Sequence, residues 1–83
     1  MEISVKLFGG LRSYLPAGSS FNACTIQVDA NATVSTLLGQ LPLPADKHYM
    51  VIINDTKIDN DDFDNVSVSA SDDVVLLPPI KGG

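Results

Sequence analysis

The residues with the clearest chemical potential lie at the end of the sequence, which closes on a glycine pair, Gly82 and Gly83. Glycine has no Cβ, so this pair can adopt backbone angles closed to other residues and can enter a channel only as wide as the main chain. Pro78 and Pro79, just upstream, lack an N–H and favour an extended segment. The two prolines form a stiff segment, here called the stem, and the two glycines form a terminus without side chains. This combination suits chemistry in which an enzyme activates the Gly83 carboxylate. The competing interpretation is a frayed terminus without a role, the usual state of chain ends.

Other side chains with chemical potential do not combine into a site. An EF-hand loop beginning at Asp59 requires glycine at its sixth position and glutamate at its twelfth, where the sequence has Asp64 and Ala70. A solvated acidic loop is therefore favoured over a calcium site. His48 has no identifiable partners, which favours a surface histidine, and Cys24 lies on an inward strand face, which favours a buried, inert thiol. We expect no metal site and no active site built by this chain alone.

Composition restricts the class of protein and of partner. The 83 residues, 45% hydrophobic, predict one small globular domain with a thin core. The formal net charge is −5 and the basic residues are scattered, which argues against nucleic acid and favours a basic protein partner. The N-terminal segment has neither the basic nor the apolar region of a signal peptide, and no run is long enough to span a bilayer. We expect a cytoplasmic protein with no membrane partner.

The first third of the chain predicts a β-hairpin. Residues 2–8 alternate, with Ile3, Val5 and Leu7 on one face and Phe8 on the other, as in a half-buried strand. Residues 23–28 alternate in the same way, and the loop between the two strands has room for a short helical turn.

The rest of the chain predicts one helix and three further strands. The helix begins after Thr33 as N-cap, carries an apolar stripe from Val34 to Leu41 and is stopped by Pro42. Strands are predicted at 49–53, 56–58 and 74–77, and an acidic excursion at 59–73 is held by Phe63, Val66 and Val68. This order indicates an α+β fold, a β-grasp mixed sheet with one main helix on one face. We assign residues 1–77 to the β-grasp domain and 78–83 to an extended C-terminal tail.

A β-grasp fold places the first and last strands side by side and parallel in the centre of the sheet. Phe8, Gly9 and Gly10 should then lie beside Leu77 and Pro78, at the base of the tail. Because one helix covers only one face, the other face should carry an apolar patch formed by Phe8 and by every second residue of the last strand. Such patches mark partner sites. The alternative is that the segment 59–73 folds over this face and hides it.

Four stretches of the sequence match one known family: 5–12, 32–38, 51–55 and 72–83. The last is the most specific, with an apolar strand, two prolines, one apolar residue, one variable residue and Gly-Gly. On these motifs the chain resembles the small sulfur-carrier subunit of molybdopterin synthase, in the ubiquitin-like group that includes the thiamine-pathway sulfur carrier. It departs from the pattern at Asp55, where glycine is common, and in its longer, more acidic segment 59–73.

The resemblance implies a cycle at the C-terminus. An E1-like adenylyltransferase would use ATP to adenylate Gly83, and a persulfide sulfur donor would convert the acyl adenylate to a thiocarboxylate. The tail would then enter the large subunit of molybdopterin synthase and give its sulfur to the dithiolene of the molybdenum cofactor. The chain itself would bind no cofactor and would be non-catalytic alone, as the small subunit of a sulfurtransferase complex.

The resemblance also assigns roles to the residues of the tail and its base. Gly83 would be the reacting group and Gly82 would provide clearance, while Pro78 and Pro79 would set the trajectory. The residues expected to contact a partner are Phe8, Leu76, Pro78, Pro79, Ile80 and Lys81, the last by pairing with an acid.

Two alternatives share the activation step. A ubiquitin-like protein modifier would transfer the activated glycine to a lysine, and a carrier for another product would supply a thiolated nucleoside or thiamine. The paired prolines argue against thiamine.

Overall fold

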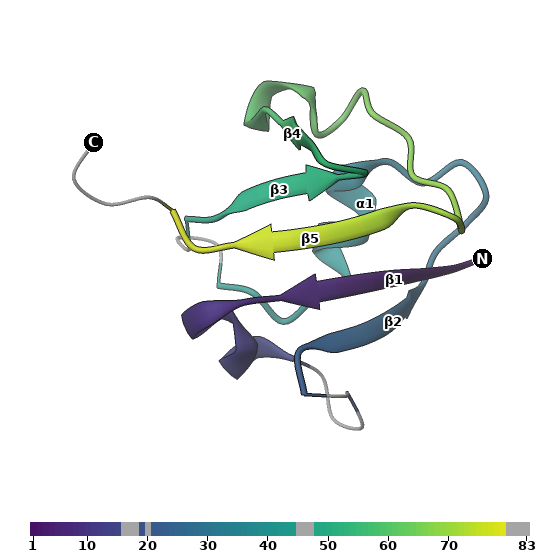
Figure 1. Cartoon of the computed structure of the whole chain (residues 1–83). Coiled ribbons are helices and arrows are strands. Elements are labelled where there is room, and N and C mark those ends of the chain that lie inside the picture. Colours follow the sequence, from purple (N-terminus) through teal and green to yellow (C-terminus); the bar gives the residue numbers. More distant parts are fainter. Residues whose placement is uncertain (16–18, 20, 45–47, 80–83) are drawn as a thin grey trace.

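The structure is a computed structural model, and it describes residues 1–15, 19, 21–44 and 48–79. A mixed sheet carries one α-helix on one face, with two short 3-10 helices beside it (Figure 1). In chain order the elements are β1 (Glu2–Leu7), η1 (Gly9–Tyr14), β2 (Ala23–Gln27), α1 (Val34–Gly39), β3 (Met50–Ile53), β4 (Thr56–Ile58), η2 (Asn60–Asp62) and β5 (Asp73–Leu77).

The sheet has five strands in the order β2-β1-β5-β3-β4. β1 and β5 are parallel at its centre, and the other neighbouring pairs are antiparallel. This is the predicted β-grasp fold, and the central parallel pair is confirmed. Figure 1 shows β1 and β5 pointing the same way.

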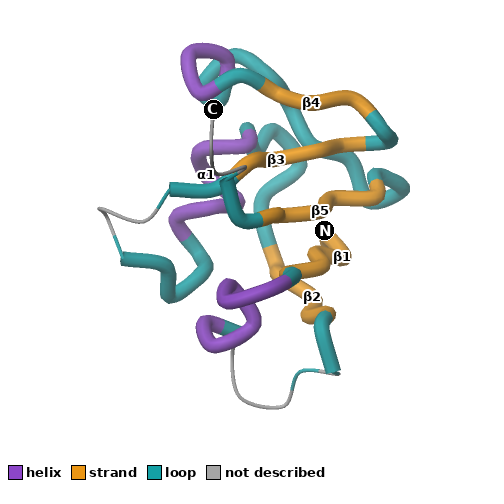
Figure 2. The backbone as a smooth tube through the Cα atoms, turned by 60° about the vertical axis from the view of Figure 1, so that its left-hand side comes forward, coloured by secondary structure: helices purple, strands orange, loops and turns teal. Residues whose placement is uncertain are grey.

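The core fills the space between the sheet and α1, which lies behind the strands in the view of Figure 1 and to one side of them in Figure 2. The alternation of β1 is confirmed, because Ile3, Val5 and Leu7 are fully buried. Val34 and Leu37 of the helix pack against them. The Thr33 side chain caps the helix by accepting a hydrogen bond from the Thr36 N–H, as predicted.

The helix is shorter than the apolar stripe suggested. It ends at Gly39 rather than Leu41, and the last turn tightens, with the Leu41 N–H donating to the Leu38 carbonyl. Glycine is a poor helix former and Pro42 follows closely, so two neighbouring residues end the helix early. Leu41 is nevertheless buried, so the stripe correctly marked core residues.

The acidic excursion between β4 and β5 packs on the helix side of the sheet. The N–H groups of Val34 and Ser35 donate to the carbonyls of Val66 and Phe63, and Val68 N–H donates to the Ala32 carbonyl. Val68 is buried, and Phe63 and Val66 pack against the core, as predicted. The excursion therefore does not cover the opposite face of the sheet.

The turn between β3 and β4 holds the start of β5. Both centre residues have positive φ angles, 52° at Asn54 and 70° at Asp55, as the tight I′ hairpin turn requires. The Asn54 side chain donates to Asp72 and accepts from the Asp73 N–H, both at 3.0 Å. Asp72 in turn accepts from the Ser69 N–H at 2.8 Å, so Asn54 connects the turn to the end of the excursion.

No helix in the part of the chain that the structure describes is long and apolar enough to cross a membrane.

The turn gives a first prediction. Asp55→Gly should raise the free energy of unfolding by about 0.5–1 kcal/mol, because a left-handed φ is unfavourable for a residue with a Cβ. Urea denaturation measures the change. Asn54→Gly is the matched control: it also relieves a left-handed residue but removes two hydrogen bonds, so it should destabilise the protein. An Asp55→Gly variant no more stable than the parent would contradict this account of the turn.

Candidate functional site at the tail end of the sheet

The stem of the tail begins where the two central strands end. The Phe8 N–H donates to the Leu76 carbonyl at 3.1 Å, which extends the β1–β5 pairing by one residue. β5 then continues into Pro78 and Pro79, both exposed. The prediction that Phe8 and Gly9 lie at the base of the tail is confirmed, and the stem leaves from the centre of the sheet rather than from an edge.

Gly9 lies directly against the stem. Its φ is +59°, in the left-handed region, and a Cβ built on it would approach Pro78 Cγ to 2.7 Å. Real Cβ atoms do not come that close to another heavy atom. Gly9 thus has two separate reasons to be glycine, its backbone angle and its contact with the stem.

The face of the sheet opposite α1 carries an apolar patch, here called the outer patch, formed by Phe8, Met50, Ile52, Val75 and Leu77. All five side chains are half-buried, and none belongs to the core cluster or to the residues packed against it. Strand register brings them together, because Met50 pairs with Leu77 and Ile52 with Val75. The prediction of an uncovered apolar patch is confirmed, and the alternative that segment 59–73 hides it is wrong. Phe8 is half-buried rather than exposed.

Two lysines flank the outer patch. Lys6 pairs with Val75 and Lys57 pairs with Ile52, so one row across the sheet runs from lysine through two apolar residues to lysine. Each lysine has a carboxylate 3.9 Å away, Asp73 for Lys6 and Asp59 for Lys57, but these are exposed pairs of little strength. The face beside the tail therefore combines apolar side chains with two lysines, each accompanied by a carboxylate.

Leu76 does not belong to this surface. It pairs with Leu7 and Val51, whose side chains lie in the core, and its own side chain is 0% exposed. The prediction that Leu76 contacts a partner is therefore wrong. Alternate residues of a strand face opposite sides of the sheet, so its neighbours Val75 and Leu77 present the apolar groups instead.

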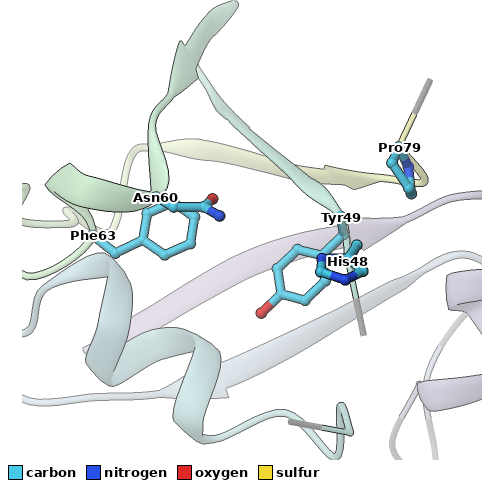
Figure 3. A pocket seen from close by; sticks show the side chains of 5 residues that line it. All are labelled: His48, Tyr49, Asn60, Phe63 and Pro79. Carbon is cyan, nitrogen blue, oxygen red and sulfur yellow. The ribbon is translucent and has the colours of Figure 1, made fainter. Parts of the chain in front are cut away.

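A small pocket lies at the base of the stem on the helix side (Figure 3). Its volume is about 160 Å³, and it is lined by His48, Tyr49, Asn60, Phe63 and Pro79. Figure 3 shows Tyr49 extending between His48 and the Asn60–Phe63 wall, with Pro79 at the opposite end. His48 is exposed, as predicted. No sequence pattern indicated that His48 and Pro79 of the stem line the same pocket.

A second feature that no sequence pattern indicated is a cation–π contact between Arg12 and Phe21, in the segment that connects β1 to β2. The Arg12 guanidinium lies 3.6 Å from the centroid of the Phe21 ring, and its Nε donates to the Phe21 carbonyl at 3.2 Å. Phe21 is 76% exposed. Neither residue belongs to a periodic pattern, so no sequence signal pairs them.

Titratable groups near the site do not form a reactive centre. Cys24 is buried, as predicted, and burial raises the pKa of its thiol, which disfavours the reactive thiolate. Burial likewise raises the pKa of the Tyr49 phenol. Among the described residues, no three His, Cys, Asp or Glu side chains gather in a group that could hold a metal ion.

The remaining residues predicted for the site are Ile80, Lys81, Gly82 and Gly83, and they lie outside the described residues. Their roles stay predictions, as does the division into a domain at 1–77 and a tail at 78–83.

Comparison with known proteins places the chain in a family context. The model of the ThiS family matches residues 5–83. The crystal structure of SAMP1 from Haloferax volcanii is similar over 100% of both chains, with 26% sequence identity and a TM-score of 0.70. A second crystal structure, of H. volcanii small archaeal modifier protein 1, has 24% identity and a TM-score of 0.69 over 95% of this chain and 98% of the other. No curated protein sequence matches the chain significantly.

The buried thiol and phenol predict a loss of stability at alkaline pH. The unfolded chain releases these protons near the ordinary pKa values of 9.0 and 10.0, while the folded chain still holds them. Their contribution to stability is thus complete at neutral pH and declines as the pH rises above 9.0. Urea denaturation from about pH 7 to 11 should show this decline, and Tyr49→Phe should flatten it above pH 10.0. An identical decline in the Tyr49→Phe variant would show that the phenol titrates equally in both states.

Proposed function

The chain belongs to the ThiS family of ubiquitin-like sulfur carriers and modifiers, and we propose that it is a sulfur carrier for the molybdenum cofactor. In this proposal the Gly83 carboxylate is adenylated, converted to a thiocarboxylate and used to supply sulfur for the molybdopterin dithiolene. The proposal requires that Gly83 carry the free carboxylate.

The observation that carries this proposal is the position of the stem relative to the outer patch. The paired prolines continue from the central strand β5, and Phe8 and Leu77 of the patch lie at the same end of the sheet. An enzyme that holds the patch is therefore placed to receive the tail. The chain contributes a docking face and a deliverable carboxylate, and the match to residues 5–83 includes both.

The chemistry divides between the chain and its partners. A Gly83 carboxylate oxygen would attack the α-phosphorus of ATP on an E1-like enzyme, releasing pyrophosphate and leaving a mixed anhydride. The terminal sulfur of a persulfide donor would then attack the Gly83 carbonyl and displace AMP, giving an acyl disulfide. A second thiol would attack the donor sulfur of that disulfide, form a disulfide with it and release the Gly83 thiocarboxylate. ATP is consumed by the activating enzyme, and no step needs a cofactor held by this chain.

In the second half of the cycle, the tail would enter the large subunit of molybdopterin synthase. There the thiocarboxylate sulfur would attack the pterin precursor, and hydrolysis would return the Gly83 carboxylate. Gly82 would give the clearance for this insertion. Ile80 and Lys81 would contact the partner beyond the prolines, while Val75 and Leu77 take the place first assigned to Leu76.

A second candidate function is protein modification, favoured by the likeness to structures of a protein named as a modifier. Conjugation begins with the same acyl adenylate and differs in the acceptor, a lysine amine instead of sulfur. Formation of isopeptide-linked products in cell extract, with no sulfur gained at Gly83, would favour this function over sulfur carriage.

The outer patch predicts a binding defect without loss of fold. Phe8→Asp should raise the KM of the activating enzyme for the carrier about tenfold or more, since it places a charge in an apolar contact. The melting temperature should change little, because Phe8 is half-buried and occupies the N-cap of η1, a position that aspartate favours. Thr25→Asp is the control: it adds the same charge at an exposed position of the edge strand β2. An equal rise in KM for both variants would assign the effect to net charge, and a large drop in melting temperature would place Phe8 in the core.

The reacting carboxylate predicts strict dependence on the chain end. Adding one alanine after Gly83 should abolish carrier-dependent ATP–pyrophosphate exchange, because the carboxylate moves beyond the adenylation centre and its glycine clearance is lost. Circular dichroism and the melting temperature should match those of the parent. An extended protein that still gains sulfur, at the carboxylate of its added residue, would refute the proposed role of Gly83 as the reacting group.

A further inference from the structure

The described part of the stem has a different part of the fold on each side. On one side Pro78 lies against Gly9, at the junction of β1 and η1. On the other side Pro79 forms a wall of the pocket that His48 and Tyr49 line. Pro78 thus lies against Gly9, while Pro79 borders the pocket, and Figure 3 shows Pro79 above the start of β3. The close approach at Gly9 is therefore the contact that can fix where the stem begins.

The contact on the Gly9 side leaves no room for a side chain. A Cβ at Gly9 would lie 2.7 Å from Pro78 Cγ and 3.4 Å from its Cδ. To restore ordinary contact, which begins at 3.4 Å, the two groups would have to separate by roughly 0.7 Å. A proline ring cannot rotate out of the way as a flexible side chain does, because it is closed onto its own backbone.

The surroundings decide which group would yield. The strand before Pro78 is fixed, since the Leu76 carbonyl accepts from Phe8 N–H at 3.1 Å and Leu77 pairs with Met50. The helix after Gly9 is also fixed, because Leu11 is 1% exposed and its N–H donates to the Phe8 carbonyl. Pro78 lies beyond the last paired residue of β5, so the displacement would fall on Pro78 and on the chain that follows it.

We propose that Gly9 is a positioning residue. Pro78 packs directly against the Cα of Gly9, which carries no side chain, and this contact sets the direction in which the tail leaves the sheet and enters the activating enzyme. This inference rests on the proposed function for its consequence, because it concerns the delivery of Gly83 to the adenylation centre. Gly10 has no such part. It has no atom within 4 Å of a built Cβ and no positive φ.

A misdirected tail and a damaged docking face have different kinetic signatures. The three atoms nearest to a built Cβ at Gly9 all belong to Pro78 and none to Met50, Ile52, Val75 or Leu77 of the outer patch. The KM for the carrier should therefore stay within about twofold of the parent. The misdirected tail should instead deliver the Gly83 carboxylate poorly to the adenylation centre, which lowers kcat. A misplacement of about 1 Å at a reacting group can cost about 100-fold, so Gly9→Ala should lower kcat about 10- to 100-fold.

The experiment is a double-mutant cycle measured by ATP–pyrophosphate exchange with the activating enzyme. It compares the parent with Gly9→Ala, with Pro78→Ala and with the double variant, and it includes Gly10→Ala as the matched control. Pro78→Ala removes Cγ and Cδ and leaves only Cβ, which lies 3.9 Å from the built Cβ of Gly9, in ordinary contact. If the contact between Gly9 and Pro78 positions the tail, Gly9→Ala should lower kcat in the parent but change it less than about twofold in the Pro78→Ala background.

The cycle also separates the contact from backbone strain. The left-handed φ of Gly9 is present in both backgrounds, so a loss of kcat caused by strain or partial unfolding would persist when Pro78 is alanine. An unrescued loss, an equal loss in Gly10→Ala, or a Gly9→Ala variant with the parent's kcat would each overturn the proposal. Rescue confined to the Gly9 and Pro78 pair would support it.

A second readout is independent of the activating enzyme. In amide NMR spectra, Gly9→Ala should shift the resonances of residues 80–83, and Gly10→Ala should leave them in place. If an activating enzyme that is competent on another carrier fails to adenylate the parent chain, the proposed function fails, and the NMR comparison still decides whether Gly9 directs the tail. If Gly9→Ala leaves the resonances of residues 80–83 unchanged, the positioning role of Gly9 is refuted, even when the parent chain is activated.

Discussion

The parallel pairing of β1 with β5 is the constraint on which the rest of the structure depends. It joins the first and last strands of the chain in the centre of the sheet, with Val5 opposite Val74 and Leu7 opposite Leu76. Parallel strands end at the same side, so this pairing brings Phe8 and Gly9 to the point where the chain leaves β5. A pairing at the edge of the sheet would leave the stem without a neighbour on one side. In the central position the stem has Gly9 on one side and the pocket residues on the other.

Strand β5 serves both sides of the sheet, which explains its nearly unbroken apolar sequence. Val74 and Leu76 face the core, while Val75 and Leu77 belong to the outer patch. A register shift by one residue would exchange the two sets and place the patch residues in the core. The turn at Asn54 opposes such a shift, because its side chain bonds Asp72 and the Asp73 N–H at the start of the strand. Fold stability and the orientation of the docking face thus depend on the same register.

Much of this arrangement could be predicted from the sequence, because alternation in β1 and β2 and the helical stripe after Thr33 are local patterns with a clear period. The sequence could not predict which residues of β5 face the core, since four consecutive apolar residues do not show which alternate pair points inward. For this reason Leu76 was assigned to the wrong side of the sheet. The pocket at the stem brings together Tyr49, Phe63 and Pro79 from three separate segments, and no local pattern relates them. The same holds for the contact between Gly9 and Pro78, which depends on long-range pairing.

The central claim is that this fold delivers a carboxylate which becomes a thiocarboxylate. The most direct measurement is the intact mass of the protein, with mapping of the C-terminal peptide, after incubation with ATP, an E1-like activating enzyme and a persulfide donor with a thiol. The account predicts a gain of about 16 Da, one oxygen replaced by sulfur, confined to Gly83. An unchanged mass, with an activating enzyme shown to be competent on another carrier, would contradict it.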